Sequence, residues 1–196
     1  MTTSSSGPGD VTHPGDATKT SYAAADGPLR AVLAAVPDDG WRAPSPCEGW
    51  TAADVVAHLV TTQRDLLTGH GADLGEAPDL DVDPAGAWSV HADRVLAALG
   101  DPELPATTFD GFFGPTTVGE TLVRFYVWDM VVHRWDVARA AGLDAGLTAV
   151  ELAQVETGAD GFGEALHMEG ICAPALDVGE TATREQKVLG RLGRRA

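Results

Sequence analysis

One long apolar segment limits the folds open to this chain: TLVRFYVWDMVVHRWDVARAAG, residues 121–142. Thr117 precedes it and Glu120 follows three residues later, which fits a capping box at a helix start. Gly142 fits the helix end, because glycine readily adopts the backbone conformation that terminates a helix. The length and apolar content of this segment predict a helix at the centre of a hydrophobic core.

Several other segments repeat apolar residues at helical spacing. We expect a helix over residues 22–36, and another that begins after Thr51, with Asp54 in a variant capping box, and ends before Gly69. Further helices are expected from Pro84, from near Thr148 and around residues 188–192, with loops at 69–83, 100–117 and 168–183. A short extended piece fits within 100–117, but no segment shows a convincing period-2 strand pattern. The patterns predict an all-α fold of about four bundle helices plus a short C-terminal helix.

Composition narrows the classes of protein that fit. The 196 residues are enough for one domain, expected at 18–196, after a Ser/Gly/Pro/Thr-rich tail at 1–17 that is expected to be disordered. A net charge of −16 argues against nucleic-acid binding and against binding to anionic membranes. The chain has no transmembrane stretch and no secretory signal pattern, and its two cysteines cannot build a disulfide framework. We expect a cytoplasmic monomer or homodimer that acts on a small molecule.

Three side chains could form a metal site. Asp129 and His133 are four residues apart, so they lie on one face of the central helix, one turn from each other. His58 lies among valines and leucines in the helix that follows Thr51, so it is expected to point inward. If the two helices face each other, these residues converge on one cation and leave coordination positions open, as in catalytic sites. Zinc is the default ion, and nickel or iron are alternatives.

Other interpretations of these residues stay open. A histidine on an apolar helix face is more often a hydrogen-bonded core residue than a ligand, and an Asp-x-x-x-His pair occurs by chance on helix surfaces. Asp54 is also four residues from His58, but the capping box gives it a sufficient role. Asp136 could accept a hydrogen bond from a ligand, act as a fourth ligand, or pair with Arg134 or Arg139.

The remaining candidates are weaker. Cys47 lies in a Pro-rich turn with no neighbouring base visible in the sequence, so a nucleophilic role has little support. Gly111 and Gly114 form no phosphate-binding pattern, because no lysine accompanies them. No site role is expected for the other histidines, which are His13, His70, His91 and His167.

Two segments, PCEGWTAADVVAHLV and DMVVHRWDVARAAG, resemble the signature segments of the DinB-like metal-binding superfamily. More narrowly, they resemble the actinobacterial branch that includes the N-terminal domain of mycothiol-dependent maleylpyruvate isomerase, and the terminal VLGRLGRR resembles the closing segment of its single-domain members. The resemblance covers nearly all of residues 20–193. It implies a DinB-like four-helix bundle with a divalent metal held at one end by His58, Asp129 and His133. Many members of the superfamily have a histidine or glutamate where this chain has Asp129.

The resemblance also implies chemistry, because characterised relatives use a metal to activate a low-molecular-weight thiol for transfer or addition. The favoured hypothesis is therefore a metal-dependent S-transferase or isomerase-like enzyme with a mycothiol-like cosubstrate and a small electrophile. The C-terminal domain of the full isomerase is not expected here, so maleylpyruvate itself is not the expected substrate. One alternative is a thiol-independent hydrolase, lyase or isomerase that uses metal-bound water or Lewis-acid catalysis, or oxygen chemistry at iron. Another is a non-catalytic metal-binding protein.

Overall fold

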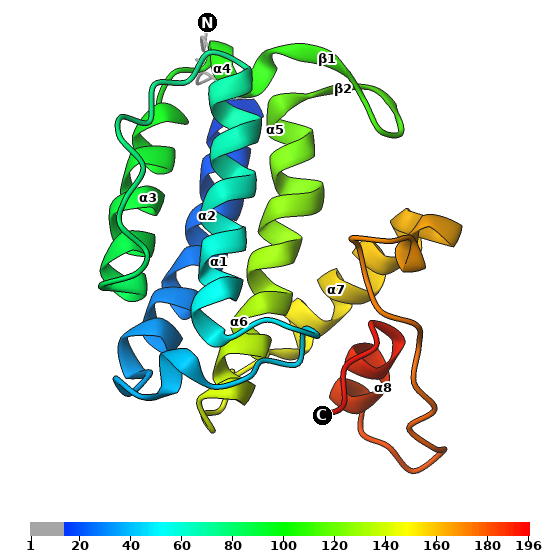
Figure 1. Cartoon of the computed structure of the whole chain (residues 1–196). Coiled ribbons are helices and arrows are strands. Elements are labelled where there is room, and N and C mark those ends of the chain that lie inside the picture. The colour runs from blue at the N-terminus through cyan, green and yellow to red at the C-terminus, as the bar shows by residue number, and fades with distance from the viewer. Residues whose placement is uncertain (1–13) are drawn as a thin grey trace, which may run out of the picture.

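The computed structural model describes residues 14–196, and its main body is a bundle of four long helices (Figure 1). Three of them are α1 (Pro14–Ala35), α2 (Ala52–Gly69) and α3 (Pro84–Ala98). The fourth is continuous through α5 (Val118–Thr121), a stretch of π-helix, η2 (Leu122–Val127), and α6 (Trp128–Ala140). The all-α fold with four bundle helices expected from the sequence is confirmed.

Capping boxes fix where the helices begin. The Thr51 hydroxyl accepts a hydrogen bond from the Asp54 backbone N–H, and the Asp54 carboxylate accepts one from the Thr51 N–H. Thr117 and Glu120 form the same reciprocal pair at the start of α5. Each pair satisfies two backbone donors that would otherwise lack partners, so local sequence alone sets these starts.

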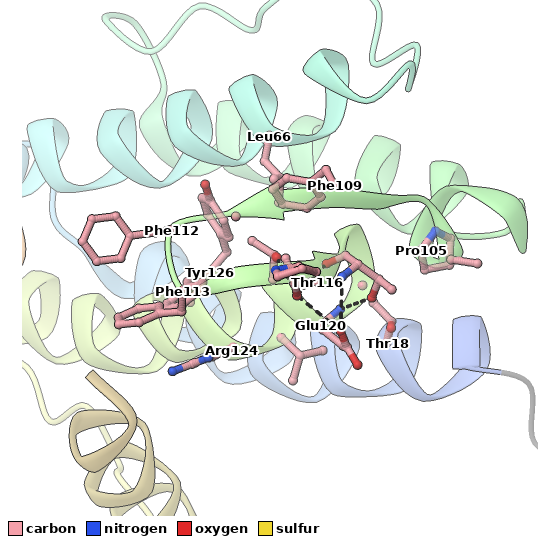
Figure 2. A pocket seen from close by; sticks show the side chains of 18 of the residues that line it. Thr18, Leu66, Pro105, Phe109, Phe112, Phe113, Thr116, Glu120, Arg124 and Tyr126 are labelled. Atoms are coloured by element: carbon pink, nitrogen blue, oxygen red, sulfur yellow. Dashed lines mark hydrogen bonds between the residues drawn. The ribbon is translucent and has the colours of Figure 1, made fainter. Parts of the chain in front are cut away.

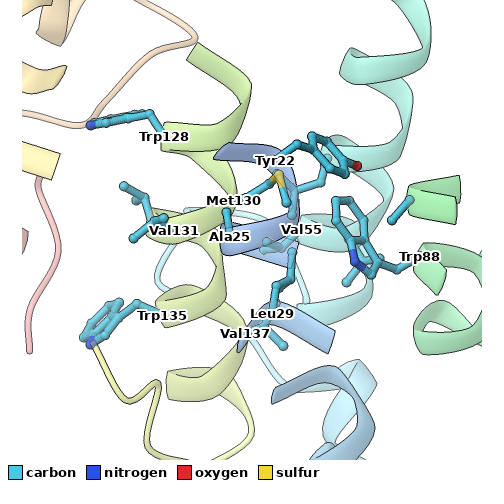
Figure 3. Packing of buried hydrophobic residues seen from close by; sticks show 14 of the residues in the cluster. Tyr22, Ala25, Leu29, Val55, Trp88, Trp128, Met130, Val131, Trp135 and Val137 are labelled. Carbon is cyan, nitrogen blue, oxygen red and sulfur yellow. The ribbon is translucent and has the colours of Figure 1, made fainter. Parts of the chain in front are cut away.

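The core surrounds α6, which packs against α1 and α2. Figure 3 shows that Met130 and Val137 of α6 face the bundle, whereas Trp128, Val131 and Trp135 point the opposite way, toward the C-terminal part of the chain. All five are buried, which explains why the helix is apolar around most of its circumference. One stripe is polar: Asp129, His133 and Asp136 follow the i, i+4, i+7 spacing of a single helix face.

One boundary expected from the sequence was wrong, at the N-terminal end of the domain. The first turn of α1 begins at Pro14, so residues 14–17, which were assigned to a disordered tail, are helical; residues 1–13 lie outside the described part. This turn forms because it packs on α4 (Glu103–Ala106), where the Gly15 backbone lies close to Pro105.

The short extended piece expected within 100–117 is present, and the rest of this segment is more ordered than the expected loop. After α4 it forms an antiparallel hairpin of β1 (Thr108–Gly111) and β2 (Gly114–Thr117), in which Thr108 pairs with Thr117 and Gly111 with Gly114. Four-residue strands are too short for a period-2 pattern to stand out in the sequence. Gly114, at a φ of 102°, supplies the positive φ that this tight connection needs.

The C-terminal part leaves the bundle and returns to it. The helix α7 (Ala149–Phe162) runs outward at an angle, η3 (Gly163–His167) follows, and the chain comes back through an irregular segment to α8 (Arg184–Arg191) (Figure 1). A short helix η1 (Gly40–Arg42) lies in the connection between α1 and α2. Among the described residues, none of the helices combines the length and apolar content needed to cross a bilayer.

Candidate metal centre

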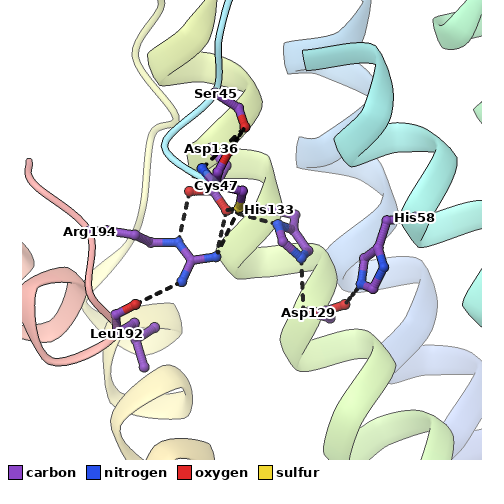
Figure 4. A network of polar contacts seen from close by, with 8 residues as sticks. All are labelled: Ser45, Cys47, His58, Asp129, His133, Asp136, Leu192 and Arg194. Carbon is purple, nitrogen blue, oxygen red and sulfur yellow. Dashed lines mark hydrogen bonds and ion pairs between the residues drawn. The ribbon is translucent and has the colours of Figure 1, made fainter. Parts of the chain in front are cut away.

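The structure brings His58, Asp129 and His133 together, although 71 residues separate His58 from Asp129 in the sequence (Figure 4). His58 Nε2 lies 3.0 Å from Asp129 Oδ2, and His133 Nε2 lies 3.3 Å from Asp129 Oδ1. One potential ligand atom from each residue falls within 4.8 Å of the other two. The side chains of His58 and Asp129 remain 28% and 23% exposed, so the cluster is reachable from outside.

These distances suit a divalent cation. Ligand atoms about 2.1 Å from a tetrahedral metal lie about 3.4 Å from one another, close to the separations seen here. Two imidazole nitrogens and one carboxylate oxygen are a donor set that zinc accepts, and nickel or iron accept it as well. Three protein ligands would leave at least one position for another molecule. The ligand role of these three residues stays a prediction.

Two buried residues behind His133, Asp136 and Arg194, fix its orientation, and we call them the second layer of the site. His133 Nδ1 lies 2.8 Å from Asp136 Oδ2, so the imidazole donates Nδ1–H to that carboxylate and turns Nε2 toward Asp129. Asp136 in turn pairs with Arg194 through two bonds, Nε to Oδ1 at 2.8 Å and Nη2 to Oδ2 at 2.7 Å. A carboxylate that holds the second nitrogen of a histidine is the usual support for a metal-binding imidazole.

The pairing of Asp136 corrects part of the sequence reasoning. Neither Arg134 nor Arg139 is its ion-pair partner: Arg134 instead reaches Glu151 of α7, with Nη1 2.7 Å from the carboxylate. Because Arg194 lies 58 residues further along the chain, helical spacing could not indicate it. The requirement that a buried carboxylate be compensated was the available signal, but it does not say which arginine does so.

The charges in the cluster are coupled. Burial would lower the pKa of His133, but the charge of Asp129 and the hydrogen bonds to Asp129, Asp136 and Cys47 together outweigh burial and hold that pKa well above its ordinary value. Burial would raise the pKa of Asp129, but the imidazoles, His133 above all, keep it below its ordinary value. Asp136 also has a lowered pKa, because the hydrogen bond from His133 and the charge of Arg194 outweigh burial. A cation that binds here must therefore displace the Nε2 proton of His133.

A cavity of about 890 Å³ opens beside the cluster. Its wall combines the three candidate ligands with Trp50, whose ring centroid lies 4.9 Å from that of His58 and 6.2 Å from that of His133. The segment 167–174 also lines this cavity. The loop at 69–83 lines no part of this cavity, and the segment 100–117 lines a different one.

Both cysteines line the same cavity, a feature that sequence reasoning missed for Cys172. Cys47 lies against the second layer, with its thiol 3.4 Å from Asp136 Oδ2 and 3.7 Å from Arg194 Nη2. His133 also lies beside this thiol, but His133 and Asp136 are bonded to each other, so neither offers Cys47 a free base and a nucleophilic role gains no support. Burial raises the pKa of Cys172, so its thiol stays protonated near neutral pH, which is also unlike a nucleophile.

The other histidines differ in where they lie relative to this cavity. His70 and His91 lie outside the cavity: His70 Nδ1 lies 2.7 Å from the Leu66 carbonyl oxygen, and His91 Nε2 lies 3.0 Å from Gln63 Oε1. His167 does line the cavity, with Nδ1 2.9 Å from the Ala173 carbonyl oxygen. His13 lies outside the described residues.

Comparison with known proteins bears on this site. The model of the mycothiol maleylpyruvate isomerase N-terminal domain matches residues 22–138, which is more than half of the chain and includes all three candidate ligands. The chain belongs to this family. Membership makes it a metal-binding, DinB-like helical protein related to mycothiol chemistry.

Two curated proteins also resemble the chain. Two uncharacterized proteins of Mycobacterium tuberculosis, from two strains, are each 29% identical to the chain over 136 residues, which covers 59% of this chain and 52% of theirs. The chain therefore spans about half the length of the curated relatives it matches. No solved structure matches the chain significantly.

Proposed function

We infer that this protein is a metal-dependent enzyme that activates a low-molecular-weight thiol, of the mycothiol type, for transfer or addition to a small electrophile. The observation that carries this proposal is the cluster of His58, Asp129 and His133 at the wall of an open cavity. Family membership supports the thiol, because the family takes its name from a mycothiol-dependent isomerase. The proposal concerns this chain, which spans about half the length of its curated relatives.

His58, Asp129 and His133 would hold the cation, with zinc as the expected ion. A cation bound there stabilises a thiolate over a thiol, so the sulfur nucleophile is available near neutral pH. Asp136 keeps the His133 tautomer that presents Nε2 to the site, and Arg194 fixes the orientation of Asp136. Trp50 packs against both imidazoles and helps to fix the position of their rings.

In the proposed reaction the S–H bond breaks, an S–C bond forms, and the electrophile loses either the bond to a leaving group or one double bond. The thiol loses its proton to solvent, and the sulfur lone pair forms the new S–C bond. In a substitution the leaving group departs with the bonding electrons; in an addition the double-bond electrons move to the neighbouring carbon, which takes a proton from solvent. Burial, Asp129 and Asp65 raise the pKa of Tyr126 at the cavity wall, so its hydroxyl stays protonated and can donate a hydrogen bond to an acceptor oxygen.

Metal analysis and conjugation assays test the proposal. The purified chain should contain close to one equivalent of zinc, and a chelator should abolish the conjugation of mycothiol to a model electrophile until zinc is returned. His133→Ala should lose both metal and activity. His70→Ala is the matched control, because this histidine of the α2 C-terminus lies outside the cavity. Conjugation that survives in His133→Ala would refute the proposal, and turnover without any thiol would replace it with a metal-dependent hydrolase or lyase.

A further inference from the structure

A second cavity, of about 1050 Å³, lies under the β1–β2 hairpin and is not explained by the metal centre (Figure 2). Its floor is the start of the fourth bundle helix, and Leu66 of α2 lines it as well. Most of its wall is apolar and aromatic, with Phe109, Phe112 and Phe113 from the hairpin and Tyr126 from η2. A cavity of this size and character is typical of a site for a small organic ligand.

The two cavities share a wall. Phe125 and Tyr126 line both, and Asp129 follows one turn later on the same continuous helix. Both aromatic residues lie in the π-helical stretch η2, an uncommon conformation that is frequent at functional sites. A molecule that lay under the hairpin could therefore extend along this wall toward the candidate metal ligands.

Aromatic rings form a row that leads in the same direction. The Phe113 ring is stacked with Phe125 at a centroid distance of 5.9 Å, Phe125 lies 5.2 Å from Phe162, and Phe162 lies 5.4 Å from Trp128. Phe112 and Phe113, at the hairpin tip, remain 71% and 45% exposed. Large apolar side chains that stay exposed beside a cavity favour an apolar, planar occupant, because such a ligand would cover them.

One positively charged side chain, Arg124, also lines this cavity. The Arg124 guanidinium carbon lies 4.6 Å from the Phe113 ring centroid, and Nη2 donates to the Gly161 carbonyl oxygen at 2.8 Å. Within the described residues Arg124 forms no ion pair, although the chain carries a net charge of −16. The other charged lining residue, Glu120, is engaged by the Thr117 N–H and the Thr116 hydroxyl. An anionic group in this cavity would thus find Arg124 as its partner.

We propose that the cavity under the hairpin binds an aromatic acid, with the ring against Phe113 and Phe125 and the anionic group at Arg124. The binding site stands on these contacts alone. Its role as the acceptor site, which holds the electrophile with its reactive carbon toward Asp129, rests on the function proposed above.

A pair of fluorescent probes tests the site without any catalysis. Anilinonaphthalene sulfonate is an aromatic anion, and N-phenylnaphthylamine has the same rings without the charge. The full chain should bind the sulfonate saturably, and Arg124→Gln should raise its Kd about tenfold while changing that of the neutral probe by less than about twofold. Phe113→Ala should raise the Kd of both probes about tenfold. Arg42→Gln and Val150→Ala are matched controls from outside both cavities and should change neither.

Two results would overturn the site: equal effects of Arg124→Gln on both probes, or probe binding that is lost on chelation, which would place the probe at the metal centre. A kinetic measurement tests the acceptor role separately. Phe113→Ala should raise KM for thiol conjugation to bromomethylbenzoate at least fivefold and leave KM for iodoacetamide unchanged. Equal KM changes would refute the acceptor role. Saturable probe binding without conjugation to any electrophile would refute the proposed function and leave the site for aromatic acids in place.

Discussion

Replacing Asp136 by asparagine tests the second layer of the candidate metal centre. Asp136 is fully buried, and its two oxygens accept hydrogen bonds from His133 and twice from Arg194. The asparagine side chain would keep the shape but lose the charge, and its amide N–H groups would face donors on at least one side. Arg194, 8% exposed, would be left without a counter-charge.

The magnitude follows from the burial of the pair. Removing one partner of a buried ion pair costs about 3–5 kcal/mol, because the other charge stays desolvated and uncompensated. For a chain of this length that corresponds to a fall in Tm of about 6–20 °C. Loss of a carboxylate that supports a metal-binding histidine lowers metal affinity by about 10–100-fold. Asp136→Asn should therefore reduce both stability and zinc affinity.

A double-mutant cycle separates these effects. Asp136→Asn, Arg194→Met and the double variant are unfolded in urea, and zinc affinity is measured by competition with a chromophoric chelator. The double variant should be less destabilised than the sum of the single variants by at least about 2 kcal/mol, since it holds no unpaired charge. Zinc affinity should fall in Asp136→Asn and in the double variant, because both lack the negatively charged acceptor that supports His133.

The reasoning would be refuted by additive stabilities, which would mean that the two charges do not compensate each other. It would also be refuted by unchanged zinc affinity in a folded Asp136→Asn protein, which would mean that the orientation of His133 does not depend on Asp136. Asp54→Asn is a suitable control, because it replaces a carboxylate at the solvent-exposed start of α2 rather than in the second layer.

Three further predictions concern other parts of the molecule. Gly158→Ala should destabilise the fold by about 1–3 kcal/mol in urea unfolding, because a Cβ at this position would lie 2.2 Å from the Trp128 ring. Gly161→Ala on the same helix is the control: its Cβ would meet nothing closer than 3.6 Å, so this variant should be neutral or stabilising. Burial lowers the pKa of His91 from 6.5 to about 4, so as the pH falls the unfolded chain takes up a proton before the folded chain does. The free energy of unfolding should therefore decrease by up to about 3 kcal/mol as the pH drops from about 6.5 to 4. Calorimetry should show a smaller decrease for His91→Gln. Zinc should change tryptophan fluorescence through Trp50, whose ring lies 4.9 Å from that of His58, and Trp50→Phe should lose most of this change.

Local patterns explain why much of the fold could be predicted. Thr51 with Asp54 and Thr117 with Glu120 act across three residues, and the structure forms both capping boxes as expected. The long apolar segment became the central helix because a helix buried on several sides needs apolar residues on several sides. The first turn of α1 was missed because it packs against α4, which is distant in sequence. A short extended piece was expected in 100–117, but the pairing of its two strands was missed because four residues are too few to show a period.

The candidate metal centre, too, could be predicted from the sequence only in part. Helical spacing by itself placed Asp129, His133 and Asp136 on one stripe, because residues one or two turns apart share a face in any α-helix. The apolar neighbours of His58 predicted that it points inward, but its meeting with Asp129 and His133 depended on the two helices facing each other, which the family resemblance implied and helical spacing could not show. Only the folded chain determined that Arg194 compensates Asp136, that Trp50 covers the imidazoles, and that the hairpin encloses a second cavity. Sequence periodicity records contacts within a few residues, whereas these contacts form between segments that only tertiary packing brings together.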